Sequence, residues 1–102
     1  MKILALEKSI DDADEQKIRL LRGKEAAQVW KLGADGLIRD MYFRRDTGTS
    51  VFILEAQTIQ EAQAVIDHLP LVAEGLVEFE LIPLGHYEPL AMLFVEEDTA
   101  KQ

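Results

Sequence analysis

The run Ser50–Glu55 (SVFILE) restricts most strongly how this chain can fold. Its central residues, Val51 to Leu54, are all apolar. Successive side chains of a β-strand point to opposite faces of the sheet, so a strand of this kind is expected to be buried on both faces. Other elements of the same chain must cover one face of this strand, and something further must cover the opposite face.

A β-hairpin is predicted around this run. The segment from Leu37 to Arg45 is a second strand, and Asp46–Thr49 (DTGT) joins the two as a turn, because aspartate starts turns and glycine accepts a positive φ. Lys2–Leu6 and Leu76–Leu84 are the other two predicted strands. Pro83 indicates that the last of them lies at a sheet edge or ends there.

Two helices are predicted between the strands. The first runs from about Asp14 to Leu32 and carries apolar residues at helical spacing. The second begins at a capping box, Thr58–Glu61, and ends before Pro70. The resulting order, β-α-β-β-α-β, predicts a ferredoxin-like α+β sandwich with both helices on one face of an antiparallel sheet. A second subunit is the simplest cover for the other face, so we expect a homodimer or a higher homo-oligomer.

The size of the chain fits one small domain. It has 102 residues, of which 48% are hydrophobic and 29% charged. We expect the domain to occupy residues 1–95, with a frayed tail at 96–102. The segment from Tyr87 to Val95 is too apolar to be left in water and should pack on something. Neither a signal peptide nor an apolar run of the ~18 residues that a membrane span requires is recognisable, so we expect a cytoplasmic protein.

Charge and composition exclude several classes of function. The net charge of −8 argues against nucleic-acid and anionic-membrane partners, which attract basic surfaces. The chain has no cysteine, which excludes thiolate metal sites and a cysteine nucleophile. Its two histidines, His68 and His86, lack the spacing of a metal site, and no nucleotide-binding or serine-hydrolase motif is present. We therefore expect no metal and no cofactor.

Four segments form an ordered pattern over roughly three fifths of the chain. They are WKLGADGLIR at Trp30–Arg39, YFRR at Tyr42–Arg45, the helix end LPL at 69–71, and the strand end IPL at 82–84. In this order the stretch resembles the muconolactone isomerase-like group of dimeric α+β barrel proteins. The resemblance implies a protomer whose sheet packs against a partner's sheet, a pocket for a small organic molecule, and, in the founding enzyme, metal-free proton transfer in an unsaturated lactone.

Two residues are candidates for proton transfer. Glu25 lies within the apolar stripe of the first helix, where burial would raise the pKa of its carboxyl, and Arg22 is placed to pair with it. The alternative is a slightly rotated helix on which both side chains reach solvent. His68, at the end of the second helix, is the other candidate, because an imidazole exchanges protons near neutral pH.

Four further residues are candidates for substrate binding. Arg39 and Arg44 lie on the second strand, and an arginine grips a carboxylate through two parallel hydrogen bonds. Arg45 competes with Arg44 for this role, and both positions also suit a solvated hairpin end. Trp30 and Tyr42 either line the pocket or pack in the core.

These observations leave two classes of function open. One is a cofactor-free isomerase or related proton-transfer enzyme that acts on a small organic acid or lactone. The other is a non-catalytic module that binds a ligand or serves only to oligomerise, because one fold supports many functions.

Overall fold

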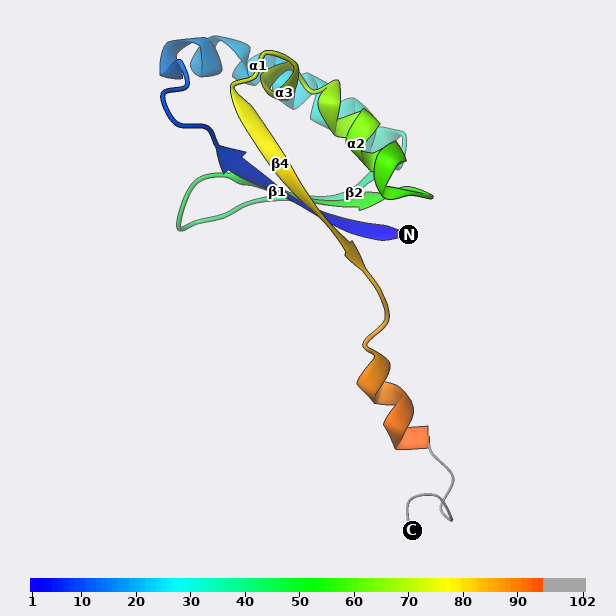
Figure 1. The fold of residues 1–102 in the computed structure, drawn as a ribbon. Coiled ribbons are helices and arrows are strands. Elements are labelled where there is room, and N and C mark those ends of the chain that lie inside the picture. The colour runs from blue at the N-terminus through cyan, green and yellow to red at the C-terminus, as the bar shows by residue number, and fades with distance from the viewer. Residues whose placement is uncertain (95–102) are drawn as a thin grey trace.

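The computed structural model describes residues 1–94 and has the predicted order β-α-β-β-α-β, with two short helices that were not predicted, one before and one after the last strand (Figure 1). The elements are β1 (Lys2–Ser9), α1 (Glu15–Ala34), β2 (Ile38–Phe43), β3 (Ser50–Glu55), α2 (Ile59–Asp67), α3 (Pro70–Ala73), β4 (Val77–Leu84) and a final 3₁₀ helix, η1 (Glu88–Phe94). The predicted domain end at residue 95 and the predicted tail at 96–102 lie outside the described residues.

The sheet has the strand order β2-β3-β1-β4, and every neighbouring pair is antiparallel. Helices α1, α2 and α3 lie together on one face of this sheet (Figure 1). This arrangement confirms the ferredoxin-like α+β prediction. β4 is an edge strand, as Pro83 indicated, and β2 forms the other edge.

Local sequence signals explain where the elements begin. The Asp14 carboxylate accepts hydrogen bonds from the backbone N–H groups of Gln16 (3.0 Å) and Lys17 (3.1 Å), and so begins α1. The Thr58 hydroxyl caps α2 by accepting from the Glu61 backbone N–H at 3.0 Å. In the hairpin, Gly48 takes the positive φ of 72° that the turn requires.

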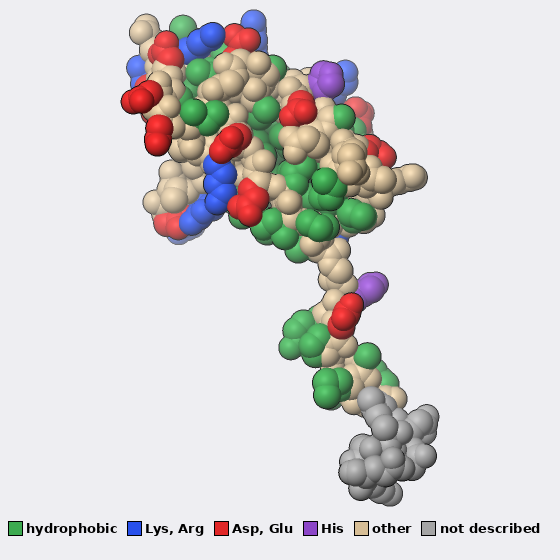
Figure 2. Space-filling view, viewed as in Figure 1, with side chains coloured by type: hydrophobic (Ala, Val, Ile, Leu, Met, Phe, Trp, Pro, Cys, Tyr) green, Lys and Arg blue, Asp and Glu red, His purple; other side chains and the backbone are tan. Residues whose placement is uncertain are grey.

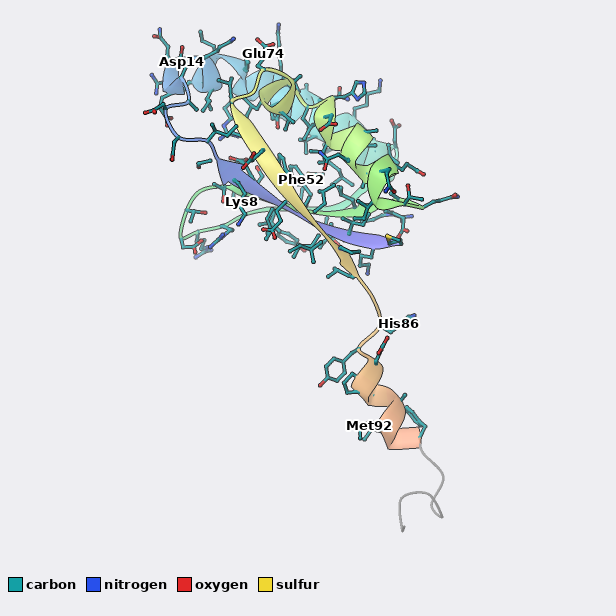
Figure 3. All side chains as sticks on the ribbon, in the orientation of Figure 1. Lys8, Asp14, Phe52, Glu74, His86 and Met92 are labelled. Atoms are coloured by element: carbon teal, nitrogen blue, oxygen red, sulfur yellow. The ribbon has the colours of Figure 1, made fainter. Side chains whose placement is uncertain are left out.

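The hydrophobic core lies between the helices and the inward face of the sheet. At its centre Phe52 of β3 stacks on Phe79 of β4, with the ring centroids 5.5 Å apart (Figure 3 labels Phe52 beneath the helices). The largest side chains that are fully buried around this pair are Ile3, Ile38, Leu54, Ile66, Leu69 and Leu71. A core of this kind fixes the relative positions of α1, β2 and β3, which form the site described below.

The outward face of the sheet carries apolar side chains that the described residues leave without a second layer. Leu4 pairs with Ile53 and Leu6 with Val51 across β1 and β3, and all four side chains are only half-buried. The prediction that β3 is buried on both sides therefore holds on one side within this chain. Cover for the other side by a second subunit stays a prediction.

The chain leaves the domain after Leu84. The segment from Gly85 to Phe94, called the arm below, extends away from the sheet and ends in η1 (Figure 1). Its apolar side chains are exposed, and they form the green patches at the far end of Figure 2. The segment that was expected to pack on something thus projects from the body. In residues 1–94 no helix combines the length and the apolar character that crossing a membrane requires.

Candidate functional site

A cleft of about 310 Å³ lies between α1 and the half of the sheet formed by β2 and β3. Its walls are largely apolar, and the two charged side chains that line it, Arg22 and Glu25, both come from α1. The remaining lining residues are Ala26, Val29, Trp30, Met41, Tyr42, Phe43, Ser50 and Phe52. A cleft of this size falls at the small end of the range for ligand pockets in proteins.

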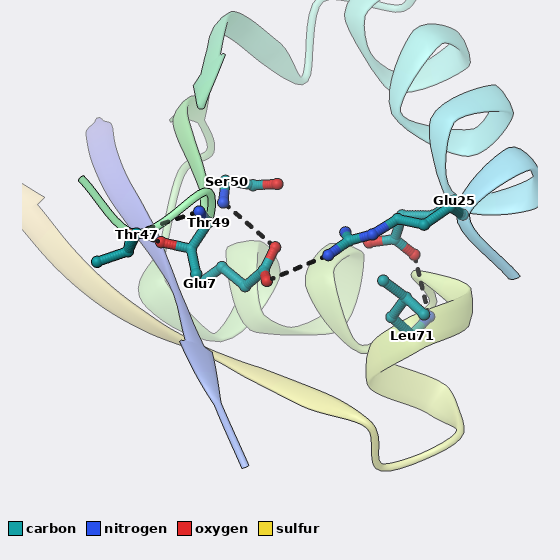
Figure 4. A network of polar contacts seen from close by, with 7 residues as sticks. Glu7, Glu25, Thr47, Thr49, Ser50 and Leu71 are labelled. Atoms are coloured by element: carbon teal, nitrogen blue, oxygen red, sulfur yellow. Dashed lines mark hydrogen bonds and ion pairs between the residues drawn. The ribbon is translucent and has the colours of Figure 1, made fainter. Parts of the chain in front are cut away.

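Glu25 is a buried carboxylate in the wall of this cleft, with 6% of its surface exposed. Its Oε1 atom accepts a hydrogen bond of 3.0 Å from the backbone N–H of Leu71 (Figure 4). Within residues 1–94 the Oε2 atom has no hydrogen-bond partner and is not fully buried. One oxygen is therefore fixed by the fold, and the other has no hydrogen-bond partner within the described residues.

Burial raises the pKa of the Glu25 carboxyl above its ordinary value of 4.5. The hydrogen bond from Leu71 and the positive charge of Arg22 act in the opposite direction, whereas the negative charge of Glu7 adds to the rise. The expected ion pair between Arg22 and Glu25 does not form within the described residues, where Arg22 pairs with Glu7 instead and acts on Glu25 only through its charge. A carboxyl with a raised pKa keeps its proton to higher pH and is a stronger base once it is ionised.

The position of Glu25 follows from the sequences of both helices that meet it. Leu21 and Val29 lie one turn to either side of it on α1 and pack against the core, so the helix presents the carboxylate inwards. Pro70 is the first residue of α3, and Leu69 before it makes no side-chain cap. The free N–H of Leu71 therefore needs an acceptor, which Glu25 supplies from another helix.

Glu7 is a second buried carboxylate beside the cleft, with 5% of its surface exposed. It accepts a hydrogen bond from the Ser50 backbone N–H at 3.2 Å and faces Nη2 of Arg22 at 3.7 Å (Figure 4). Sequence reasoning missed Glu7 because the first strand was expected to end at Leu6. The alternation of Ile3, Ala5 and Glu7 on the inward face of a longer strand was the signal for it.

The mouth of the cleft is formed by exposed apolar side chains, called the apolar rim below: Trp30, Met41, Tyr42 and Phe43. Trp30 of α1 is 74% exposed and Tyr42 of β2 is 61% exposed. Both had been expected either to bind substrate or to fill the core. Neither is a core residue, and the structure brings both together with Glu25 in one cleft.

Arg39 and Arg44 do not line the cleft. The pairing of β2 with β3 is irregular between Ile38 and Asp40, so Arg39 falls at a bulge in the strand. β2 ends at Phe43, which places Arg44 in the turn rather than on the strand. There it donates two hydrogen bonds to Asp46, of 3.0 and 2.6 Å, and these bonds lower the pKa of the Asp46 carboxyl.

His68 lies apart from Glu25, at the end of α2. Its Nδ1 atom is 2.6 Å from the carbonyl oxygen of Ala64, a contact in which the ring nitrogen donates. The side chain borders a separate, more open groove of about 330 Å³ between α1 and α2.

No group of three His, Cys, Asp or Glu side chains with the geometry of a metal site occurs in the described part of the chain.

A scan of protein-family models found no match to the sequence, and a search of curated proteins found none either. Solved structures do match. One is 5-chloro-2-hydroxyhydroquinone dehydrochlorinase from Burkholderia phenoliruptrix AC1100 in complex with 2,5-dihydroxybenzoquinone, with a TM-score of 0.68 and 18% identity over 86% of this chain and 97% of that chain. Another is muconolactone isomerase, with a TM-score of 0.69 and 17% identity over 85% of this chain and 91% of that chain. The chain therefore shares its fold with these two enzymes.

Proposed function

We propose that the cleft binds a small oxygenated ring compound and that Glu25 transfers a proton to or from it. The observation that carries this proposal is the buried Glu25 carboxyl, whose pKa is raised by burial and whose Oε2 atom is left free beside an apolar cleft. Buried titratable groups in a cleft are frequent at catalytic sites because proton transfer needs a pKa near the working pH.

The proposed step is an isomerisation by proton transfer. Ionised Glu25 takes a proton from a carbon next to a conjugated carbonyl, so the C–H bond breaks, an O–H bond forms, and the electron pair moves onto the carbonyl oxygen. Return of a proton from the Glu25 carboxyl to a different carbon shifts the double bond and restores the carboxylate, and while the carboxyl holds it the proton can exchange with solvent. The step needs no other reactant, because the numbers of atoms and electrons are unchanged.

The substrate class is supported by the walls of the cleft. The indole of Trp30 and the ring of Phe52 offer flat apolar surfaces to a ring compound. The dehydrochlorinase structure holds 2,5-dihydroxybenzoquinone, and the isomerase is named for a lactone, so both structural neighbours handle small oxygenated rings. We assign the anchoring of a negative substrate oxygen to Arg22, which lines the cleft, rather than to Arg39 or Arg44.

Exchange of hydrogen for deuterium tests the proton transfer directly. The protein is incubated in D₂O with an unsaturated γ-lactone, and loss of the ring C–H signal is followed by NMR. We expect the wild type to accelerate exchange and Glu25→Gln to lower the rate by about 100-fold or more, which is the usual size of a general-base effect. Undiminished exchange in Glu25→Gln would contradict the assignment of the base.

A non-catalytic binding module is the second candidate. It is favoured by the hydrogen bond from Leu71, which gives Glu25 a structural role without any chemistry. In that case 2,5-dihydroxybenzoquinone would bind to the wild type and to Glu25→Gln equally, and neither protein would accelerate deuterium exchange. Calorimetric binding measured beside the exchange assay therefore separates the two candidates.

We also propose self-association through the outward face of the sheet. The half-buried pairs Leu4–Ile53 and Leu6–Val51 support it, because these apolar side chains lack cover in the described residues. Sedimentation of the full chain at micromolar concentration tests it. A strictly monomeric species would contradict the proposal.

A further inference from the structure

The charged groups around the cleft do not leave a spare positive charge for an anionic ligand. Nη2 of Arg22 is 3.7 Å from Oε2 of Glu7, so the guanidinium already faces a carboxylate (Figure 4). The uncharged lining residues, the apolar rim included, contribute no formal charge of either sign. Among the described residues that line the cleft, Arg22 is therefore the sole source of positive charge, and Glu7 balances it.

The elements packed around Glu25 bring few other ionisable groups to it. From α3 the backbone N–H of Leu71 reaches the carboxylate, while Glu74 at the end of that helix is in an ion pair of 3.0 Å with a lysine of α1. From β2 Tyr42 lines the same cleft, and the lining residues of β3 carry no charge. Within residues 1–94 the charges that shift the pKa of the Glu25 carboxyl are those of the arginine and the carboxylate just described.

A negatively charged ligand in this cleft would add a charge that the lining does not offset. Ionised Glu25 would then face both Glu7 and the ligand, and apolar walls give an ion little of the solvation that water provides. A proton on Glu25 removes one of these negative charges. The ligand and the proton must therefore favour each other's binding, because such coupling is reciprocal.

We infer that the cleft binds an oxygenated ring anion together with one proton, which Glu25 takes up from solvent. The negative oxygen of the ligand lies against Arg22. The protonated carboxyl donates to the ligand through Oε2, the oxygen that Leu71 does not hold. The inference rests on the proposed function for the ligand class, and it adds the ionic form in which the ligand and Glu25 meet.

The same combination of charges occurs midway through the proposed isomerisation. Once Glu25 has taken a proton from carbon, the carboxyl is neutral and the oxygen of the ligand is negative. An anion that binds with a proton reproduces this intermediate, whereas a neutral lactone beside ionised Glu25 resembles the starting state. A site that stabilises the intermediate more than the starting state is what catalysis requires.

The inference fixes the direction of the pH dependence of binding. Burial already raises the pKa of the Glu25 carboxyl in the empty cleft, and a bound anion raises it further. Affinity for the anion is therefore highest below the pKa of the empty protein, and it falls by up to about tenfold per pH unit as the pH rises past that value. A neutral ligand of the same shape gains nothing from the proton.

Calorimetric titration of the full chain with two matched ring compounds tests the inference. Furan-2-carboxylate carries one negative charge, furan-2-carboxamide has nearly the same shape without it, and neither titrates between about pH 6 and about pH 8. Binding enthalpies in phosphate and in Tris, whose ionisation enthalpies differ, give the number of protons taken up. The proteins are the wild type, Glu25→Gln and His68→Gln, the last as control for the other candidate proton carrier, which borders the separate groove.

We expect the wild type and His68→Gln to take up at least about half a proton per bound carboxylate at about pH 7, and none with the carboxamide. Glu25→Gln should take up none. From about pH 6 to about pH 8 the wild type should lose at least about fivefold in affinity for the carboxylate, whereas Glu25→Gln should stay within about twofold. Circular dichroism verifies that each variant is folded.

A second measurement uses the wild type alone, in case Glu25→Gln does not fold. Difference infrared spectroscopy at about pH 7 should show the C=O stretch of a protonated carboxyl appearing when furan-2-carboxylate binds, and not when the carboxamide binds. Absence of this band in a saturated complex would contradict proton uptake by a carboxyl.

Several calorimetric results would overturn the inference. They are equal uptake in wild type and Glu25→Gln, equal uptake with carboxylate and carboxamide, loss of uptake in His68→Gln, and failure of both furan-2-carboxylate and 2,5-dihydroxybenzoquinone to bind. The deuterium exchange assay keeps these results distinct from failure of the proposed function. Proton uptake without exchange would support the inference and contradict catalysis, whereas exchange of the neutral lactone without binding of either anion would do the reverse.

Discussion

The backbone N–H of Leu71 donates a hydrogen bond to Oε1 of Glu25 across 3.0 Å, between residues that are 46 positions apart in the sequence. The bond joins the middle of α1 to the first turn of α3. The Glu25 carboxylate accepts this hydrogen bond and can also take up a proton. These two properties are separable, because any side-chain oxygen can accept the bond, whereas only an acid can carry the proton.

Replacement of Glu25 separates these properties by their effect on stability. Glu25→Ala leaves the N–H of Leu71 buried without an acceptor, and we expect a loss of about 1–3 kcal/mol in the free energy of unfolding. Glu25→Gln keeps an acceptor oxygen of the same reach and should lose less than Glu25→Ala. Urea unfolding of the three proteins measures both values. Equal losses in Ala and Gln would show that the hydrogen bond contributes little.

The raised pKa of Glu25 predicts a specific pH dependence of stability. The folded protein holds the Glu25 proton more tightly than the unfolded chain does, so this group stabilises the fold fully below its ordinary pKa of 4.5. The contribution is lost as pH rises through the higher pKa of the folded state. We therefore expect the free energy of unfolding of the wild type, relative to Glu25→Gln, to fall across this window and then level off.

The comparison with Glu25→Gln removes other titrations from this measurement. The pKa values of Asp46 and Glu55 are lowered, by the hydrogen bond from Arg44 and by that from the N-terminal ammonium respectively, and their contributions are lost as pH falls. Both groups are present in each protein, so their effects cancel. A difference between the two proteins that stays constant from about pH 4 to about pH 8 would contradict the raised pKa.

The second buried carboxylate should matter more for its hydrogen bond than for its ion pair. Glu7→Ala leaves the N–H of buried Ser50 without an acceptor and should cost about 1–3 kcal/mol. The contact with Arg22 is 3.7 Å long and the arginine side chain is 38% exposed. A double-mutant cycle of Glu7→Gln with Arg22→Gln should therefore give a coupling below about 1 kcal/mol by urea unfolding. A larger coupling would mean that the pair is better shielded from water.

Arg22 and Arg44 should differ in their effect on ligand binding. We expect Arg22→Gln to weaken binding of 2,5-dihydroxybenzoquinone, whose hydroxyls ionise readily, by about tenfold or more, the scale of a charge-assisted hydrogen bond. Arg44→Gln should leave the affinity within about twofold, since that side chain is held by Asp46 outside the cleft. Titration calorimetry measures both. A larger loss of affinity in Arg44→Gln than in Arg22→Gln would indicate that Arg44, and not Arg22, anchors the ligand.

Much of the fold was predictable because its signals are local. The strand at Ser50–Glu55 was predicted with its observed bounds, and the turn before it was predicted from aspartate and glycine. The cap of α2 at Thr58 was likewise predictable from the four adjacent positions Thr58–Glu61. The bulge in β2 was not predictable, because it depends on how that strand pairs with β3 rather than on its own residues.

The site was predictable only in part, for the same reason. The spacing of Glu25 between Leu21 and Val29 indicated burial, and burial is what the structure has. Its partner could not be predicted, since Leu71 has no side-chain signal and acts through its backbone. The apolar composition of the arm predicted that it packs against another surface. Composition alone does not identify that surface.

Glu25 accepts the hydrogen bond from Leu71 and is also the proposed proton carrier, and this double role affects how such a protein can change over evolutionary time. A single nucleotide change that converts the Glu25 codon to glutamine exchanges one oxygen for a nitrogen and keeps an oxygen opposite Leu71. Selection for folding alone would act only weakly against this substitution, whereas selection for proton transfer would eliminate it. A lineage of this chain could therefore exchange chemistry for simple ligand binding in one step, with the scaffold left intact.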